Sequence, residues 1–324
     1  MENLLTILIS LLAIIALVQL VRIFELATKL KGQQEIEISD KENHYNGLAL
    51  LIVGFGFVLF VAYSFKLWGH LILPESASLH GIQIKLLWDT TMYLILFVFF
   101  ITQPLLFWFS YKYRGKKNNK ALYQTHNNKL EIIWTSIPAI VLTALVVFGL
   151  KTWNNVMVPD TSNAMVMEVY AMQFNWTARY SGEDNKLGDA NYTLIGGINT
   201  LGVDINDSAS SDDIITREIH LPVDEQVLMK FRSQDVIHSA YMPHLGVQMN
   251  CVPGMSTQFA FTPIKTTSEM RKELKNEEFD YVLLCNKICG SAHYNMQIKV
   301  IIETKQEYLE WMSQQDNFNT LISR

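Results

Sequence analysis

Long apolar runs dominate the first half of the chain. Four stretches contain no charged residue, namely residues 4–21, 48–65, 92–109 and 132–150. Each is close to the ~20 apolar residues that a helix needs to cross the hydrocarbon core of a membrane. The pattern predicts four transmembrane helices rather than buried helices of a globular core, because so many apolar runs leave no polar faces to cover them.

The charged loops set the expected orientation of these helices. The loop at residues 111–130 carries six Lys and Arg residues and no acidic residue, so the positive-inside rule places it in the cytoplasm. Four spans then place both termini, and everything after Trp153, on the outer side. The start Met1-Glu2-Asn3 lacks the positive charge of a signal peptide, so the first helix is expected to be retained.

The second half of the chain has a different pattern. From about residue 165 onward, short stretches rich in β-branched and aromatic residues alternate with Gly, Pro, Asn and Asp clusters. Many short strands of this kind predict a sandwich or barrel. A polar, mostly acidic insertion occupies residues 181–217, and residues 304–323 favour a terminal helix. The predicted fold class is therefore α+β, with membrane helices followed by a β-barrel outside the membrane.

These changes in pattern divide the chain into four predicted parts. An N-terminal two-helix membrane segment covers residues 1–75, and a transmembrane hairpin covers residues 76–155. A β-domain that includes the insertion covers residues 156–303, and a helical tail covers residues 304–324.

Composition excludes several classes of protein. Charged residues make up only 18% of the chain, against roughly 25% in soluble domains, and 49% of residues are hydrophobic, so a disordered protein is excluded. Three cysteines are too few for a disulfide scaffold. The net charge of −5 provides no basic surface for nucleic acid, so no nucleic-acid partner is expected.

Soft metal ligands are concentrated near the C-terminus. Two thiols, an imidazole and a thioether come from Cys285, Cys289, His293 and Met296. Ligands of this kind select copper, zinc or iron–sulfur centres over magnesium or calcium. A disulfide between the cysteines would leave the histidine and methionine unexplained, and a thioether is not a usual zinc ligand. The set therefore favours copper, as in blue-copper sites with an axial methionine.

The second cysteine exceeds what one blue-type copper ion requires. Two thiolates can each bridge two metal ions that share one unpaired electron, and such a centre suits electron transfer. It needs a second histidine from upstream, for which the chain offers His220, His238 and His244. His220 lies in a predicted strand and could equally be an ordinary half-buried residue, and spacing alone does not choose between His238 and His244.

Two motifs carry a resemblance to a known family. The pattern Cx3CGxxHxxM, preceded by DVxHS at residues 235–239, resembles subunit II of cytochrome c oxidase, the haem–copper terminal oxidase with a dinuclear CuA centre. Residues 79–89 and 126–138 also match the family. The resemblance implies a two-helix anchor followed by a cupredoxin Greek-key β-barrel. It assigns copper ligation to the side chains of His238, Cys285, Cys289, His293 and Met296 and to the backbone carbonyl of Lys287.

The resemblance implies a redox subunit of a membrane-bound oxidase. Two copper ions would accept electrons from a cytochrome c and pass them to haem a of subunit I, which would also hold CuB and reduce oxygen to water while protons are pumped. The expected partners are subunits I and III, membrane lipid and a separate cytochrome c, since the chain has no CxxCH motif for a haem of its own. The expected location is a bacterial cytoplasmic membrane, with the copper domain in the periplasm. The alternative is a membrane-anchored copper-storage or copper-delivery protein without oxidase activity.

Two departures from the family concern a second metal. The family usually has glutamate where this chain has Lys287, and often aspartate where it has Asn250. In the family the glutamate carboxylate also reaches a magnesium site at the subunit I interface. We therefore expect this magnesium site to be absent, or rebuilt without a carboxylate of this chain.

A third departure concerns the path of electrons into the centre. The family motif QWYW, whose first tryptophan faces cytochrome c, reads QFNW at residues 173–176. Electrons are therefore expected to enter through Phe174, or through a neighbouring aromatic residue such as Trp176 or Tyr241. The alternative is that these aromatic residues belong only to the core of a strand.

Glu131 has two interpretations. Asn128-x-x-Glu131 has the form of a helix capping box, and acidic residues favour helix N-termini. The resemblance instead places Glu131 at the mouth of the K proton channel of subunit I, where protons would be taken up.

The remaining segments lie outside the usual pattern of the family. In the first two runs, Gln19, Gly54 and Gly56 are candidates for helix–helix contacts that hold a membrane-tethered electron donor in a supercomplex. The acidic insertion is either a solvated loop or a source of electrostatic steering for a basic cytochrome c. It lacks the glycine and glutamate spacing of an EF-hand calcium site.

Overall fold

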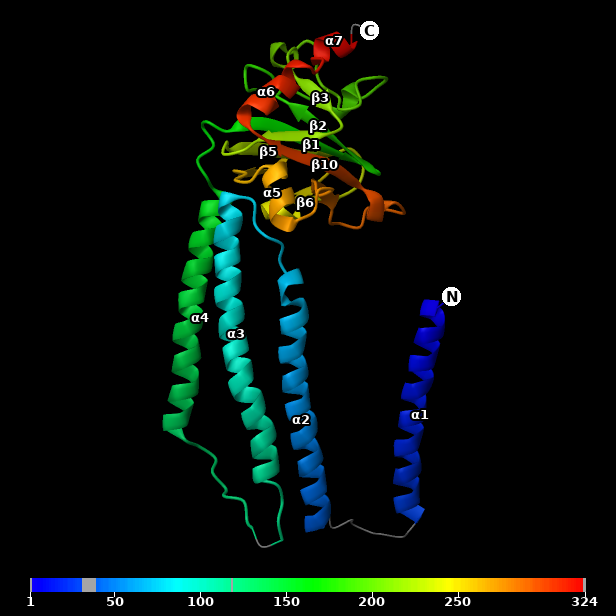
Figure 1. Cartoon of the computed structure of the whole chain (residues 1–324), viewed down its shortest axis with the longest axis vertical. Coiled ribbons are helices and arrows are strands. Elements are labelled where there is room, and N and C mark those ends of the chain that lie inside the picture. The colour runs from blue at the N-terminus through cyan, green and yellow to red at the C-terminus, as the bar shows by residue number, and fades with distance from the viewer. Residues whose placement is uncertain (1, 31–38, 118, 323–324) are drawn as a thin grey trace. The chain divides into compact units, whose positions relative to one another are not determined.

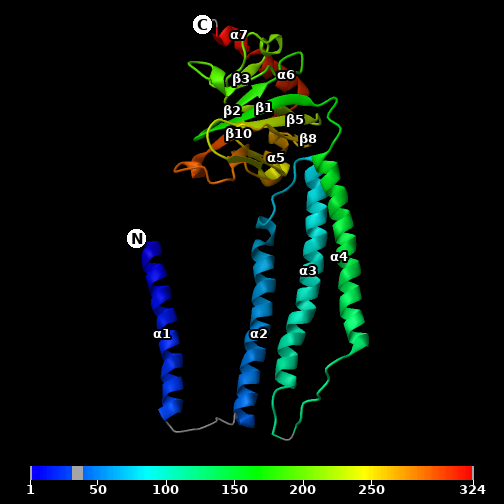
Figure 2. The ribbon, with the colours of Figure 1, turned by 180° about the vertical axis from the view of Figure 1, so that it is seen from behind.

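The computed structural model describes residues 2–30, 39–117 and 119–322 (Figures 1 and 2). The chain forms two compact units, Met1–Ala62 with Phe99–Thr125, and Tyr63–Val98 with His126–Arg324. Its long helices are α1 (Glu2–Leu30), α2 (Asp40–Trp68), α3 (Leu79–Lys112) and α4 (Asn128–Met157).

Three helical segments of the described residues are long and apolar enough to cross a membrane. They are Asp40–Leu71, Leu79–Lys112 and Asn128–Met157, and they contain the second, third and fourth predicted spans. The structure thus supports the second, third and fourth predicted spans. The first predicted span, residues 4–21, falls in α1, and many of its side chains lie outside the described residues, so its crossing stays a prediction.

In the first unit, α2 packs against the C-terminal part of α3. A Cβ atom at Gly54 would come 2.1 Å from the ring of Phe107, so only glycine leaves room for that ring. Phe57 and Phe99 add an edge-to-face contact with ring centroids 6.0 Å apart. Gly56, the other glycine expected at a helix contact, has open space where a side chain would lie.

In the second unit, the chain after α4 forms two five-stranded sheets. Their orders are β3-β2-β1-β5-β8 and β4-β10-β9-β6-β7. The pairs β1–β5 and β4–β10 are parallel, and the other pairs are antiparallel. The strands are β1 (Met165–Met172), β2 (Asn175–Tyr180), β3 (Ile214–Thr216), β4 (Ile219–Pro222), β5 (Val227–Ser233), β6 (His238–Met242), β7 (Val247–Cys251), β8 (Thr257–Phe261), β9 (Tyr281–Cys285) and β10 (Gln297–Glu303).

The core of the β-domain lies between the two sheets. In β5, the side chains of Val227, Met229 and Phe231 are buried while the residues between them are partly exposed. This alternation is what a strand with one face on the core requires. Leu283 and Val300 of the other sheet are also fully buried in the same core. The predicted α+β class, with membrane helices before a cupredoxin-like β-domain, is confirmed.

The acidic insertion is folded onto the β-domain rather than fully solvated. It contains the short 3₁₀ turns η2 (Tyr192–Leu194) and η3 (Ser208–Ser210). Leu201 and Val203, each 1% exposed, form a second small core with Tyr170 and Phe318. The burial of these apolar side chains therefore packs the insertion against the β-domain.

A buried ion-pair network also ties the insertion to the sheet. Arg179 of β2 donates to Glu168 of β1 at 2.8 Å and to Asp213 of the insertion at 3.0 Å, and Arg232 of β5 also donates to Glu168. Burial raises the pKa of Asp213 to about 6 in spite of the Arg179 guanidinium. Burial also disfavours the Glu168 carboxylate, but the two arginines hold its pKa below the usual range.

The C-terminal segment forms two helices, α6 (Lys305–Ser313) and α7 (Phe318–Ile322), so the single helix predicted over residues 304–323 is wrong. The chain turns between them because the backbone N–H of Phe318 donates to Asp213 O at 2.7 Å and its ring fills the second core. The side chain of Asn317 then accepts from the backbone N–H of Thr320 and starts the new helix. One further helix, α5 (Thr267–Leu274), precedes β9.

Candidate metal centre

The register of β6 and β9 brings two of the predicted ligands together. Ala240 of β6 lies opposite Cys285, the last residue of β9. His238 comes two residues before Ala240, so its side chain lies on the same face of the sheet and reaches the same end of β9. The backbone N–H of Cys285 donates to Met296 O at 3.0 Å, which folds the segment between them into a loop.

The other ligand candidates come from this loop, which contains the 3₁₀ turn η5 (His293–Asn295). Cys285 Sγ lies 3.8 Å from Cys289 Sγ and 3.7 Å from His238 Nδ1. Cys289 Sγ in turn lies 3.6 Å from His293 Nδ1 and 3.8 Å from Met296 Sδ. The donor atoms of five side chains, one from β6, one from the end of β9 and three from the loop, therefore lie close together.

These distances fit shared metal ions. With metal–sulfur and metal–nitrogen bonds of zinc size, two sulfurs on one tetrahedral ion lie about 3.8 Å apart, and a sulfur and a nitrogen about 3.6 Å apart. Cys285 and Cys289, whose sulfurs are not joined in a disulfide, link His238 on one side of the cluster to His293 and Met296 on the other. The backbone carbonyl of Lys287 lies 3.2 Å from Cys285 Sγ and adds an oxygen donor. The residues present therefore suit a soft metal such as copper, held by thiolate, imidazole and thioether donors.

Four of the six ligand candidates are buried, whereas His293 is partly exposed and Lys287 is exposed. His238 is fully buried, Met296 is 1% exposed, and Cys285 and Cys289 are 9% and 6% exposed. Burial, together with the neighbouring Cys285 thiol, raises the pKa of Cys289 to about 11. A metal ion must therefore displace a firmly held proton, and metal binding is expected to release protons.

An aspartate orients the buried histidine. Asp235 Oδ1 lies 2.8 Å from His238 Nε2, on the opposite side of the ring from Cys285. A proton on Nε2 leaves Nδ1 as the free acceptor that faces the sulfur, which is the tautomer a metal ligand needs. Burial opposes the Asp235 carboxylate, but hydrogen bonds from His238, Gln173 N and Val236 N hold its pKa below the usual range.

The structure chooses among the three upstream histidines. Only His238 joins the two cysteines in a cluster whose ligand atoms lie within 4.8 Å of one another in the described residues. His220 instead stacks on Trp311 with ring centroids 3.9 Å apart. His244 packs edge-to-face on Phe279, and burial lowers its pKa. These two histidines are thus occupied elsewhere in the fold.

The aromatic residues singled out by the sequence lie in different surroundings. Trp176 is 2% exposed, its indole N–H donates to Met296 O at 3.4 Å, and its ring lies 6.0 Å from the ring of His238. Phe174 is partly exposed and packs against the core and against Gly290. Tyr241 is partly exposed on β6, opposite Leu284 of β9. Trp176 therefore touches the ligand set but has little surface to offer a partner.

Glu131 lies in the first turn of α4, but the capping residue differs from the predicted one. The N-cap is Asn127 rather than Asn128, because the Asn127 side chain accepts from the backbone N–H of Leu130 at 3.1 Å. The carboxylate of Glu131 remains partly exposed, with His126 Nδ1 4.0 Å away.

Two residues near the centre were missed by the sequence analysis. Cys251 lies opposite His238 in the pairing of β6 and β7, and burial raises its pKa to about 12. Gln173 donates from its side chain to Cys289 O at 2.5 Å. Gln173 is the first residue of the QFNW motif, but the sequence analysis considered only the aromatic residues of that motif.

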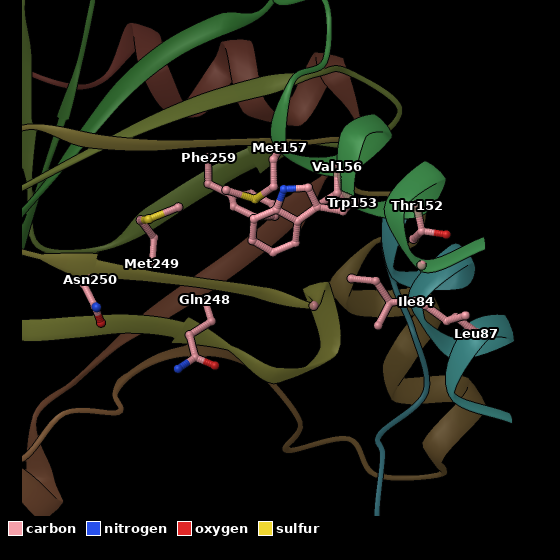
Figure 3. A pocket seen from close by; sticks show the side chains of 12 residues that line it. Ile84, Leu87, Thr152, Trp153, Val156, Met157, Gln248, Met249, Asn250 and Phe259 are labelled. Carbon is pink, nitrogen blue, oxygen red and sulfur yellow. The ribbon is translucent and has the colours of Figure 1, made fainter. Parts of the chain in front are cut away.

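A mainly apolar cavity of about 510 Å³ lies apart from these ligands (Figure 3). Ile84 of α3 lies at one side of the lining, and the indole of Trp153 of α4 lies beside Phe259 of β8. Gln248 and Asn250 of β7 add amide groups to the lining.

The expectation that the family's magnesium site lacks a carboxylate of this chain stays a prediction.

Comparison with known proteins identifies relatives that match both the membrane helices and the β-domain. Residues 66–152 match the family profile "Cytochrome C oxidase subunit II, transmembrane domain", and residues 165–304 match "Cytochrome C oxidase subunit II, periplasmic domain". The chain is 31% identical to the alternative cytochrome c oxidase subunit 2 of Bradyrhizobium diazoefficiens, over 86% of this chain and 94% of that one.

Two further relatives have lower identity. Cytochrome c oxidase subunit 2 of Cereibacter sphaeroides is 26% identical over 74% of this chain and 78% of that one. The crystal structure of the periplasmic domain of cytochrome oxidase subunit II from Bradyrhizobium japonicum is 21% identical over 48% of this chain and 95% of that one, with a TM-score of 0.33.

Proposed function

The chain belongs to the cytochrome c oxidase subunit II family, and we propose that it is the electron-accepting subunit of a haem–copper oxidase. It is a membrane-anchored protein with a periplasmic domain. The observation that carries the proposal is the convergence of His238, Cys285 and Cys289 on one buried cluster, with donor atoms at distances suited to a shared metal.

We assign two copper ions to this cluster. When bound there, such a pair supplies one-electron transfer, with the electron shared between both ions. The thiolates of Cys285 and Cys289 would bridge the ions, and His238 and His293 would bind one ion each. Met296 and the carbonyl of Lys287 would be the weaker ligands, since a thioether and a carbonyl are poorer donors than thiolate or imidazole.

The protein around the cluster supports rapid electron transfer. The ligands come from two paired strands and a loop closed by the hydrogen bond from Cys285 N to Met296 O, so the fold constrains their positions. Burial of His238 and Met296 excludes water that would otherwise reorganise when the charge changes. Rigid ligands and a dry site both lower the cost of moving an electron.

We assign the following partners to this function. A separate cytochrome c would donate electrons, tethered to the membrane or diffusing in the periplasm, and subunit I would receive them on its haem a. Subunit III and lipid complete the assembly in a bacterial cytoplasmic membrane. Phe174 or Tyr241 would receive the electron at the surface, because Trp176 is nearly fully buried. Glu131 would take up protons on the cytoplasmic side.

A copper-storage or copper-delivery role has less support. The family profiles match both the helical residues 66–152 and the β-domain, which is the full arrangement of an oxidase subunit. A storage protein would also gain nothing from a buried cluster whose ligands are held by the fold, because release of the metal would require that the loop opens.

Electron paramagnetic resonance of the purified oxidase tests the proposal. We expect the hyperfine pattern of one electron shared equally by two copper ions, together with near-infrared absorption. Cys285→Ser should abolish this signal. Cys251→Ser is the matched control, since Cys251 is also buried but lies outside the cluster, and it should retain the signal. Zinc in the metal analysis, or a disulfide between Cys285 and Cys289, would refute the assignment.

A further inference from the structure

The turn between β1 and β2 lies directly on the ligand loop. A Cβ atom at position 290 would come 2.7 Å from Cζ of Phe174, so Gly290 is what allows the ring to rest on this part of the loop. Gly290 also has a φ of 148°, a backbone conformation that L side chains rarely adopt. The residue after the ligand Cys289 is therefore held in contact with the β1–β2 turn.

Gln173, next to Phe174 in the same turn, adds a polar contact to this packing. Its side-chain amide donates to Cys289 O at 2.5 Å. The acceptor is the backbone of a ligand residue, so the bond fixes the peptide plane from which the Cβ and Sγ atoms of Cys289 project. Because the side chain of Cys289 has a single χ angle, a fixed peptide plane leaves its sulfur few positions.

The backbone of the same residue is linked to the other side of the cluster. Gln173 N donates to Asp235 Oδ2 at 2.7 Å, while Asp235 Oδ1 accepts from His238 Nε2 at 2.8 Å. The chain of contacts therefore runs from His238 through Asp235 and Gln173 to Cys289. Both ends are predicted ligands, and the middle is an exposed surface turn.

We propose that Gln173 is a positioning residue of the copper centre. From its place at the protein surface, it sets the distance between His238 and the thiolate of Cys289. This inference rests on the function proposed above. Asp235 alone would orient His238, and the hydrogen bonds of Gln173 link that carboxylate to the backbone of Cys289. The amide of Gln173 also points its positive end at the ligand loop, which favours the reduced, less positively charged state of the centre.

Two substitutions at this position test the proposal in the intact oxidase. Gln173→Leu keeps the size of the side chain and removes its N–H groups, and Gln173→Glu replaces the donor by an oxygen that faces Cys289 O. Both should lower the reduction potential of the centre and change its copper hyperfine pattern. Copper should also be lost to a chelator faster, on the order of the 10–100-fold effect typical of groups that support a metal ligand.

Gln258→Leu is the matched control, because Gln258 is an exposed glutamine on β8 of the same domain. It should leave the potential, the spectrum and the copper retention unchanged. Wild-type spectrum and potential in both Gln173 variants would overturn the positioning role. A wild-type oxidase without the shared-electron signal would instead refute the proposed function itself, so the two failures are distinguishable.

Discussion

Glu131 closes the first turn of α4 on Asn127, whose backbone N–H donates to the carboxylate at 3.2 Å. Because a glutamine oxygen accepts the same bond, Glu131→Gln should leave the helix intact, at a cost below about 1 kcal/mol. If Glu131 takes up protons for the oxidase, the same substitution removes the titratable group and should lower turnover strongly. Oxygen consumption by the purified oxidase, at unchanged copper content, measures the difference.

Glu42→Gln provides the matched control for this prediction. Glu42 accepts from Ser39 N at 2.8 Å at the start of α2, so it plays the same local role in another membrane helix. If Glu131 serves only as a helix cap, both variants should have the turnover of the wild type. Equal turnover in Glu131→Gln and Glu42→Gln would therefore remove Glu131 from the proton path.

Asp235→Asn tests whether the ring of His238 depends on its carboxylate partner. Asparagine can still accept a hydrogen bond from Nε2, but it lacks the charge that makes the imidazole a stronger donor to a metal. We expect copper affinity to fall roughly 10–100-fold, measured by competition with a chelator. Asp160→Asn, an exposed residue before β1, is the control and should bind copper like the wild type. Unchanged affinity in Asp235→Asn would show that a neutral acceptor beside Nε2 is sufficient and that the charge of Asp235 is not needed.

Phe174 can be tested as the surface residue that receives electrons. Phe174→Leu keeps much of the apolar packing against Gly290 but removes the aromatic ring, whereas Phe174→Trp supplies the indole that the family usually has. We expect slower oxidation of reduced cytochrome c in the first variant and a faster rate in the second, with copper content unchanged in both. Stopped-flow measurement gives these rates. Equal rates in all three proteins would assign the electron path elsewhere, for example to Tyr241.

The ligand set was largely predictable because metal chemistry is local in sequence. Cys285, Cys289, His293 and Met296 lie in one loop, and their order alone indicates soft-metal ligation. The remaining histidine was not predictable from spacing, since it depends on which strand pairs with β9. In the sequence, only the resemblance of residues 235–239 to the family singled out His238, and the register that places Ala240 opposite Cys285 gives the physical reason.

The helices and strands followed from their apolar patterns, but long-range packing did not. Leu201 and Val203 lie in a segment whose charge indicates a surface loop, but they are buried in a small core with Tyr170 and with Phe318 from the C-terminal segment. The same contact breaks the predicted terminal helix. Gln173 shows the limit within the site, because its hydrogen bond joins residues 116 positions apart in sequence.

The last prediction concerns the pH dependence of the folded insertion. Burial raises the pKa of Asp213 to about 6, above the ordinary value of 3.8. The folded state therefore binds this proton more tightly than the unfolded state. The contribution of Asp213 to stability should become less favourable as the pH rises from about 4 to about 6, by an amount on the order of 3 kcal/mol.

Hydrogen exchange of the intact protein measures this contribution. The Asp213→Asn side chain cannot ionise. As the pH rises from about 4 to about 7, the protection factors of amides in residues 199–217, corrected for intrinsic exchange, should therefore increase in the variant relative to the wild type. Amides of β7, which belongs to the other sheet, serve as an internal control and should show no such change between the two proteins. If the difference between the proteins were the same at every pH, the ion pair with Arg179 would fully offset the burial of the carboxylate, and Asp213 would carry its charge at all of these pH values.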